Sequence, residues 1–306
     1  MSSKTSNERT PARAGAEAAP IKGAHPLVVA TRSLGHRWVR RVTRQSHDGG
    51  VRRPAPPPPC PPGWQVGPPD FVGVGGQRCG TTRWFRLIAS HPEVASSPTD
   101  KELHFFDRFY SGGFGEADVA AYHAYFPRPS GAKAGEWTPL YGSSAWTPRL
   151  LARAAPDARL LILLRDPVER FVSALQHNAR LSHEQGMPLN RLAPVEAFRR
   201  GLYHAEIEAL LAYFDRSRLL VLQYERCVRE PLEPLRRTFE FIGLEDIGFS
   251  PPGLDSKPNS QSSKPKLDRA TRDSYIRAYR DDVEALARAF PEIDLALWPN
   301  FADIAG

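Results

Sequence analysis

A glycine-rich turn follows a short apolar run near residue 70. The run is Phe-Val-Gly-Val at 71–74, and the turn is Gly-Gly-Gln-Arg-Cys-Gly-Thr-Thr at 75–82. The spacing of Trp84, Leu87 and Ile88 then predicts a helix. A strand, a glycine-rich turn and a helix N-terminus direct backbone N–H groups at one point, as phosphate and sulfate sites do. The sequence therefore predicts an anion cradle formed by Gly76, Gln77, Arg78, Cys79, Gly80, Thr81 and Thr82.

This turn differs at one decisive position from the turn of nucleoside triphosphatases. Their pattern is Gly, four residues, Gly, Lys, then Ser or Thr; Gly75 and Gly80 have this spacing, but Thr81 stands in place of the lysine. That lysine reaches the β- and γ-phosphates, so a P-loop nucleotide kinase is an alternative and not the leading interpretation. Arg78 can supply the cation instead. The structural alternative is a plain tight turn with an incidental arginine.

A second cationic position follows the longest apolar run of this region, Leu-Leu-Ile-Leu-Leu at 160–164. Such a run suits a central parallel strand covered on both faces. Arg165 would lie at the carboxyl edge of the sheet, where open α/β sheets bind ligands. Ser173 would lie about two turns into the following helix. The alternative for Arg165 is an ion pair with Asp166 or Glu169.

Four segments, in this order along the chain, resemble a known family. Residues 71–92 resemble the 5′-phosphosulfate loop of sulfotransferases that use 3′-phosphoadenosine-5′-phosphosulfate (PAPS). Lys-Glu-Leu-His-Phe-Phe-Asp at 101–107 is similar to their acceptor-site motif, and Gly-Glu-Trp-Thr-Pro-Leu-Tyr at 135–141 to a further motif. Leu-Arg-Asp-Pro-Val-Glu-Arg at 164–170, with Ser173, resembles the 3′-phosphate motif. The group resembled is the bacterial sulfotransferase-domain proteins related to heparan sulfate sulfotransferases.

The resemblance implies a P-loop-like three-layer fold, PAPS as co-substrate and no metal. PAPS has two separate anionic ends, so the turn would hold the 5′-phosphosulfate, and Arg165 and Ser173 the 3′-phosphate. Arg78 would stabilise the bridging oxygen as the sulfate leaves. Glu102 and His104 are two residues apart and would face the same side of an extended segment. The family favours Glu102 as the base with His104 assisting, although the two roles can be reversed.

Two departures from the family bear on the acceptor. Trp137 stands where the heparan group often has lysine, which disfavours a highly anionic glycan; the indole either stacks on a sugar ring or packs in the core. The cysteine-bounded loop of the heparan enzymes is missing. The polar loop at 257–264 stands in its approximate place and either closes over the 3′-phosphate or is an ordinary surface loop.

We therefore expect in-line transfer of a sulfuryl group from PAPS to a hydroxyl of a carbohydrate, a lipid or a secondary metabolite. The alternatives are the nucleotide kinase and an inactive phosphonucleotide-binding scaffold. An intact pair of Glu102 and His104 speaks against the scaffold.

The elements that must position these residues alternate along the chain. Apolar runs predict strands at 71–74, 160–164 and 219–222. Apolar residues at helical spacing predict helices after the turn, from Pro167, and around 203–214, 232–242 and 275–290. Alternating strands and helices indicate an α/β fold with a parallel sheet.

Proline and positive charge are concentrated at the N-terminus. Residues 1–70 hold 12 of the 30 prolines, nine of them between Pro54 and Pro69, and 11 Lys and Arg against 4 Asp and Glu. Residues 71–306 hold 30 of each sign, which removes the usual argument for nucleic-acid binding. We predict a disordered, basic, Pro-rich tail at 1–69 and a sulfotransferase domain at 70–306. The stretch from Pro54 to Pro69 is expected to be a polyproline spacer that stands away from the sheet.

The remaining expectations concern location and contacts. Residues 27–44 form either a basic amphipathic helix in weak peripheral contact with an anionic membrane or a solvated tail without set structure. Cys60, Cys79 and Cys227 make neither a disulfide framework nor a zinc site. The N-terminal region has no apolar run long enough for a signal peptide, and no run in the chain approaches the ~18 apolar residues of a membrane helix. A reduced, cytoplasmic compartment is expected.

Overall fold

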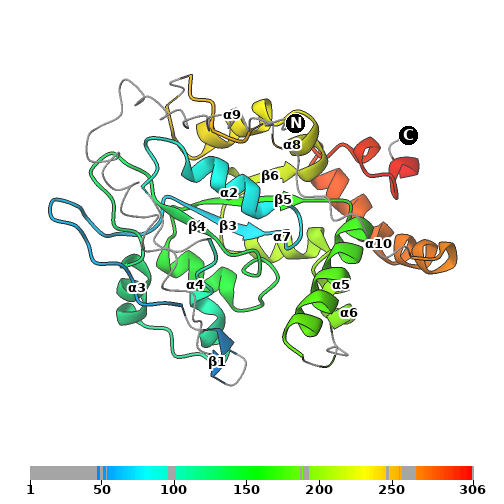
Figure 1. The fold of residues 1–306 in the computed structure, drawn as a ribbon, viewed down its shortest axis with the longest axis horizontal. Coiled ribbons are helices and arrows are strands. Elements are labelled where there is room, and N and C mark those ends of the chain that lie inside the picture. Colours follow the sequence, from blue (N-terminus) through cyan, green and yellow to red (C-terminus); the bar gives the residue numbers. More distant parts are fainter. Residues whose placement is uncertain are drawn as a thin grey trace, which may run out of the picture.

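The computed structural model describes residues 47–48, 51–52, 54–95, 101–186, 188, 193–245, 248–254, 256 and 267–304. The expected amphipathic helix at 27–44 and the polar loop at 257–264 lie outside these residues. The same holds for most of the tail predicted to be disordered. Figure 1 shows the described elements gathered around one central sheet.

The central sheet has four parallel strands in the order β4-β3-β5-β6. They are β3 (Phe71–Gly75), β4 (Gly135–Trp137), β5 (Arg159–Leu164) and β6 (Leu219–Gln223). β5 and β6 pair in continuous register from Leu160 opposite Leu219. The pairing of β3 with β5 shifts between Gly73 and Gly75, where the chain leaves the sheet for the glycine-rich turn.

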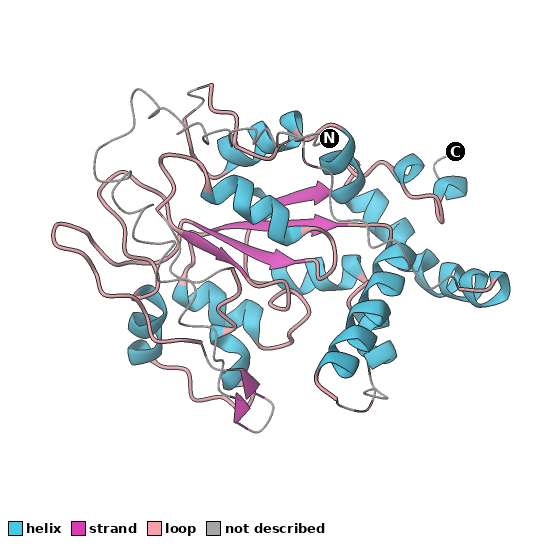
Figure 2. Cartoon of the chain, in the orientation of Figure 1, coloured by secondary structure: helices cyan, strands magenta, loops and turns pink. Residues whose placement is uncertain are grey.

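Helices cover both faces of this sheet, as the alternating side chains of β5 require. Leu161 and Leu163 pack with the first helical layer, whose members are α2 (Thr81–Ala89), α8 (Tyr224–Arg229) and α9 (Leu232–Phe241). Leu160, Ile162 and Leu164 pack with the second, whose members are α4 (Thr147–Ala154), α7 (Tyr203–Leu211) and α10 (Arg269–Ala289). Figure 2 shows helices on both sides of the strands. The predicted three-layer α/β fold is confirmed.

The remaining elements surround this core. They are β1 (His47–Asp48) and β2 (Val51–Arg52), which pair antiparallel, η1 (Phe105–Phe109), α3 (Glu116–His123), α5 (Pro167–Glu184), α6 (Ala193–Arg199), η2 (Arg216–Arg218), η3 (Leu295–Leu297) and η4 (Ala302–Ile304). In the described ranges no helix is long and apolar enough to cross a membrane.

The predicted strands and helices lie close to their expected positions, and the differences have local causes. α7 ends at Leu211, three residues before Phe214, which the apolar pattern had included. β4 was not predicted because three residues are too few to show an alternating pattern. It can lie beside β3 because Gly135 has no side chain: a Cβ there would come within 2.3 Å of the carbonyl oxygen of Phe71.

The proline-rich segment at 54–69 lies against the folded body, so the expectation that it stands away is wrong. Tyr125 Oη donates to the Ala55 carbonyl at 2.5 Å. Gln65 and Arg128 exchange two backbone hydrogen bonds of 2.9 Å, and Arg128 Nη2 donates to the Pro68 carbonyl at 2.8 Å. Proline lacks an N–H group but keeps its carbonyl acceptor, so such a segment can still dock through accepted bonds. The domain boundary at residue 70 stays a prediction.

These contacts predict a difference between two N-terminal truncations. Removing residues 1–68 should lower the melting temperature by about 4–8 °C relative to removing residues 1–53, because the lost hydrogen bonds contribute about 2 kcal/mol net. Differential scanning calorimetry of the two truncated proteins measures this directly. Equal melting temperatures would show that the segment contributes nothing to stability.

Candidate active site

The glycine-rich turn closes back onto the sheet. The Gly76 N–H donates to the Leu163 carbonyl at 3.0 Å, and the Cys79 N–H donates to the Gly76 carbonyl at 3.3 Å. A Cβ at Gly76 would lie 2.9 Å from both the Leu163 oxygen and the Cys79 sulfur. Only glycine therefore lets the turn approach β5 this closely.

The turn ends in the first turn of α2. Gly80 precedes the helix with a φ of 84°, a left-handed conformation that glycine adopts without strain. A Cβ at Gly80 would also meet the Tyr224 ring at 2.8 Å. Helix geometry leaves the N–H groups of Thr81 and Thr82 without acceptors inside α2, so they are available to an anion at this end. The local geometry is that of the expected anion cradle.

Arginine side chains gather at this cradle. Arg78 Nε donates to Ser173 Oγ at 3.3 Å, and Arg165 Nη1 donates to the Arg78 carbonyl at 3.4 Å. The Arg165 guanidinium also lies over the Tyr224 ring, 4.9 Å from its centre. Burial lowers the pKa of Arg78, and the charges of Arg165 and Arg180 lower it further. Half-buried like charges repel one another, and a bound anion would relieve that repulsion.

The carboxylates that follow Arg165, which offered the alternative of an ion pair, contact other groups. Asp166 accepts from the N–H groups of Val168 and Glu169 and so caps α5. The Glu169 carboxylate pairs with Arg272 at 2.9 Å. The ion pairs of the described residues include none between Arg165 and either carboxylate, and Arg165 directly follows the carboxyl end of β5.

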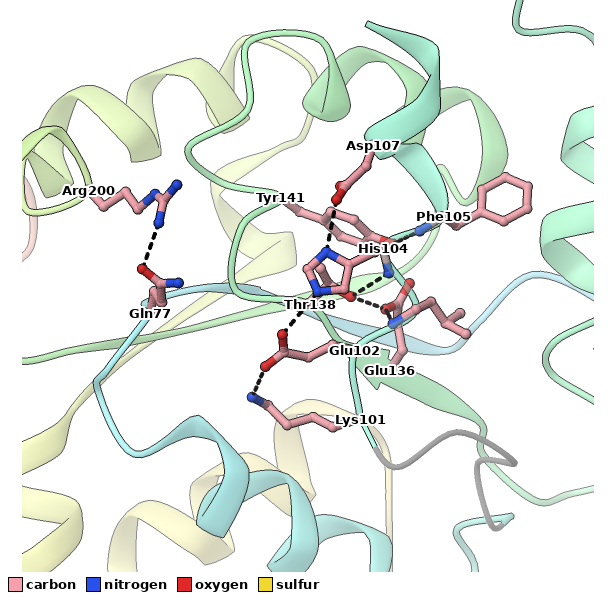
Figure 3. Close-up of polar contacts among 11 residues, drawn as sticks. Gln77, Lys101, Glu102, His104, Phe105, Asp107, Glu136, Thr138, Tyr141 and Arg200 are labelled. Carbon is pink, nitrogen blue, oxygen red and sulfur yellow. Dashed lines mark hydrogen bonds and ion pairs between the residues drawn. The ribbon is translucent and has the colours of Figure 1, made fainter. Parts of the chain in front are cut away.

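The other residues of the turn have different surroundings. Gln77 Oε1 accepts from Arg200 Nη1 at 2.8 Å, so this side chain faces the residues between α6 and α7 (Figure 3). Cys79 is buried, and burial raises the pKa of its thiol to about 11, which keeps it protonated. Thr81 is buried and Thr82 is exposed.

A row of alternating charges lies on the segment after residue 100 (Figure 3). Lys101 Nζ contacts Glu102 Oε1 at 2.5 Å, Glu102 Oε2 lies 3.1 Å from His104 Nε2, and His104 Nδ1 lies 2.9 Å from Asp107 Oδ2. The expected extended conformation is wrong here, because His104 has a φ of 53°. The two predicted side chains nevertheless meet, and Asp107 orients the imidazole.

The pKa of Glu102 reflects this arrangement. Burial alone would raise it, but the hydrogen bond with His104 and the charge of Lys101 outweigh burial and hold the pKa at about 2. Glu102 is thus a carboxylate over the whole working range of pH. Its side chain is 34% exposed, whereas that of His104 is 1% exposed, so the carboxylate is the member of the pair that a substrate can reach.

Glu136 supports this segment from behind. Its carboxyl group is completely buried and accepts from Tyr122 Oη at 2.9 Å, Thr138 Oγ1 at 2.6 Å and the Leu103 N–H at 3.3 Å. Burial raises the pKa of Glu136 to about 7, and these hydrogen bonds oppose the rise. Glu136 therefore anchors the backbone between Glu102 and His104.

Trp137 joins the two halves of the site. Its N–H donates to the Lys101 carbonyl at 3.2 Å, and its indole Nε1 donates to the Gly75 carbonyl at 2.8 Å. The side chain is completely buried. Of the two interpretations of Trp137, packing is therefore correct, and stacking on a sugar ring is excluded.

The sequence reasoning missed two residues on α5. Burial lowers the pKa of His177, and so do the charges of Arg78 and Arg180, while Glu102 raises it. His177 thus lies within electrostatic reach of both the turn and the acid–base pair, and Arg180 Nη2 is 3.5 Å from its Nδ1. Ser173, His177 and Arg180 follow one another at spacings of four and three, which places them on one helix face. This helical spacing was the signal in the sequence from which His177 and Arg180 could have been placed beside Ser173.

Arg200 was also missed, because only the fold brings it to Gln77. Over the described residues no group of three or more His, Cys, Asp or Glu side chains is arranged to hold a metal ion.

Known proteins resemble this chain in sequence and in fold. Residues 68–250 match the family model of the sulfotransferase domain. Heparan sulfate glucosamine 3-O-sulfotransferase 6 of Homo sapiens is 32% identical over 191 residues, which are 58% of this chain and 53% of that protein. The Mus musculus protein of the same name is 32% identical over 209 residues, 64% of this chain and 58% of that protein. The chain thus spans little more than half the length of these curated relatives.

A solved structure shares the fold. The sulfotransferase from Alicyclobacillus acidocaldarius superposes with a TM-score of 0.58 at 24% identity, over 76% of this chain and 99% of that one. The family match covers the cradle, the row from Lys101 to Asp107 and the α5 face in one continuous region. The chain belongs to the sulfotransferase family.

Proposed function

We propose that the protein transfers a sulfuryl group from PAPS to a hydroxyl of an acceptor. The observation that carries the proposal is the hydrogen bond from Arg165 to the Arg78 carbonyl beside the N-terminus of α2, together with His177 on α5, whose pKa responds to the charges of both Arg78 and Glu102. A polyanionic donor needs the cations, and removal of a hydroxyl proton needs a base such as Glu102.

In this proposal the donor occupies the cradle through both of its anionic ends. The backbone N–H groups of Thr81 and Thr82 and the Arg78 guanidinium bind the 5′-phosphosulfate. Arg165 and Ser173 bind the 3′-phosphate. Ser173 Oγ accepts from Arg78 Nε in this structure, which leaves its O–H free to donate to the phosphate when the donor binds.

The proposed transfer is an in-line displacement. The acceptor oxygen forms a bond to sulfur while the bond from sulfur to the bridging phosphate oxygen breaks, and the hydroxyl proton passes to Glu102. Arg78 stabilises the charge that develops on the departing oxygen. A carboxylate with a pKa of about 2 is a weak base. The acceptor hydroxyl therefore displaces Lys101 or His104 from one Glu102 oxygen, which raises the pKa of that carboxylate and makes it a better base.

The acceptor in this proposal is a hydroxyl compound of the carbohydrate, lipid or secondary-metabolite class. The curated relatives are named for heparan sulfate, but the position where that group often has lysine is filled here by a buried indole. A cytoplasmic location and a weak membrane contact through the basic tail stay predictions.

Binding of adenosine 3′,5′-bisphosphate (PAP) tests the donor site. Isothermal titration calorimetry should show PAP binding to the wild-type protein. Arg165→Ala should weaken it by about 1.5–3 kcal/mol, the range for a hydrogen bond to a charged group. Arg149→Ala is the matched control, because Arg149 is exposed on α4. Tighter binding of ATP than of PAP, with activity lost in EDTA and restored by magnesium, would favour a kinase instead.

The role of Arg78 is tested by turnover. Arg78→Ala should reduce kcat by about 10²–10³, the usual cost of losing one transition-state donor. Arg78→Lys should retain more activity, because it keeps a cation in the cradle. Turnover of Arg78→Ala within about threefold of wild type would reject the assignment.

The low pKa of Glu102 predicts how pH affects activity. In the wild-type protein, Glu102 stays ionised until the pH falls to about 2, so it causes no loss of kcat/KM at mildly acid pH. Lys101→Met removes a charge that lowers this pKa, so the acid limb of the kcat/KM profile should move to higher pH. Lys133→Met is the control, because Lys133 Nζ lies 3.8 Å from Asp70 Oδ1 and its charge therefore serves a carboxylate other than Glu102. Identical acid limbs in wild type and Lys101→Met would contradict the assignment, as would full activity of Glu102→Gln.

A further inference from the structure

Tyr203, at the start of α7, is a buried tyrosine to which the proposed mechanism gives no role. Its side chain is completely buried, and its Oη donates to the Arg165 carbonyl at 2.8 Å. The same oxygen lies 3.7 Å from Cys79 Sγ. Arg165 belongs to the proposed 3′-phosphate site and Cys79 to the glycine-rich turn. One hydroxyl group therefore contacts both parts of the proposed donor site.

The protons of these groups determine the direction of both contacts. Burial holds the pKa of Tyr203 well above its ordinary value, so the hydroxyl keeps its proton. The Arg165 carbonyl can only accept, so the hydroxyl donates to it and presents its lone pairs to the thiol. Burial also keeps Cys79 protonated, with a pKa of about 11, so its S–H can donate to Tyr203. The Gln77 carbonyl, 3.7 Å away, is a second acceptor for this thiol.

The helix that carries Tyr203 is fixed at this end. The N–H groups of His204 and Ala205, in the first turn of α7, donate to the Asp282 carboxylate of α10 at 3.1 and 3.2 Å. The Tyr203 ring lies 6.2 Å, centre to centre, from the ring of Trp298, which is also completely buried. The hydroxyl thus has a defined position relative to the core.

The turn is tied to β5 and the residue after it at two places. At its beginning, the Gly76 N–H donates to the Leu163 carbonyl at 3.0 Å. Further along, the contact through Tyr203 joins Cys79 to Arg165, which directly follows β5. Loss of the second tie would let the later part of the turn shift relative to Arg165.

Tyr203 also differs from the other links between the two parts in what donor binding does to it. Arg165 Nη1 donates to the Arg78 carbonyl and Arg78 Nε to Ser173 Oγ, but the proposed donor engages these same side chains. Tyr203 instead bonds the main chain at residue 165 and contacts the Cys79 thiol, to which the proposed mechanism assigns no part of the donor. This link therefore persists when the donor binds.

We propose that Tyr203 is a positioning residue that fixes the spacing of the two anion sites and so selects adenosine nucleotides phosphorylated at both the 3′ and the 5′ position. This inference rests on the proposed function, because it takes the turn and Arg165 as those two sites. The ribose sets the separation of the two phosphates, so a bisphosphate gains from both sites only when their spacing matches. A monophosphate uses one site and is insensitive to the spacing.

Binding of three nucleotides to the full-length protein tests this role. PAP has both phosphates, whereas adenosine 5′-monophosphate and adenosine 3′-monophosphate have one each. Isothermal titration calorimetry gives the Kd of PAP, and displacement of PAP gives those of the monophosphates. Tyr203→Phe removes only the hydroxyl. It should weaken PAP binding about fivefold, the scale of one hydrogen bond, and change the binding of each monophosphate by less than about twofold.

Tyr279→Phe is the matched control. Tyr279 is also completely buried, and its Oη donates to the Phe198 carbonyl on α6 at 3.0 Å, outside both anion sites. This variant loses the same kind of hydrogen bond, so it should lower the melting temperature about as much as Tyr203→Phe does but keep the preference for PAP. A purely structural role of Tyr203 would make the two variants behave alike.

Cys79→Ala tests the same link from the side of the turn. It should also weaken PAP binding more than the binding of either monophosphate. Because both substitutions break one link, Tyr203→Phe and Cys79→Ala combined should weaken PAP by less than the product of their separate effects.

An unchanged ratio of the PAP and monophosphate Kd values in Tyr203→Phe would overturn the inference, as would fully multiplicative effects of the two substitutions. The proposed function would stand in both cases. A wild-type protein that binds PAP no more tightly than the monophosphates would reject the proposed function and the inference together.

Discussion

The buried indole of Trp137 is the contact on which the geometry of the site depends. Its Nε1 donates to the carbonyl of Gly75, where the glycine-rich turn begins, while its backbone N–H donates to the carbonyl of Lys101, where the charged segment 101–107 begins. One residue of β4 therefore positions both halves. The space for the indole exists because Gly73 has no side chain: a Cβ there would overlap the indole ring at 2.0 Å.

A second constraint follows from placing cations near a carboxylate. Arg78 and Glu102 carry opposite charges and would neutralise each other if they paired. The structure gives each a separate partner: Ser173 for the guanidinium, and Lys101 with His104 for the carboxylate. Each charge is thus held by a partner of its own. The contacts of Lys101 and His104 with Glu102 also account for its low pKa, because they stabilise the ionised form.

The parts that could be predicted from the sequence are those that short-range patterns determine. The strand at 71–75, the turn and the helix after it are contiguous, so the cradle was predictable from spacing alone. Arg165 was placed correctly because it directly follows a buried strand. The conformation of His104 was not predictable, since its positive φ arises where Thr138 and Tyr141, more than thirty residues away, bond the backbone at 104 and 105.

The docking of the segment at 54–69 escaped prediction for a similar reason. Its many prolines leave it few N–H donors, but its carbonyls accept from Tyr125 and Arg128, and the Gln65 N–H donates to the Arg128 carbonyl. His177 differs from these cases. It follows Ser173 by one helical turn, so the helix pattern already placed it on the site's side of α5; only its proximity to both Arg78 and Glu102 required the fold.

The replacement of a lysine by Trp137 therefore has a structural consequence as well as an electrostatic one. In this chain the indole fills a fully buried space that Gly73 leaves open, and a lysine there would bring an ammonium group into an apolar layer, which is costly without a partner. Gly73 and Trp137 are thus coupled. The indole of Trp137 therefore belongs to the core, and its two hydrogen bonds act on the site from within that core.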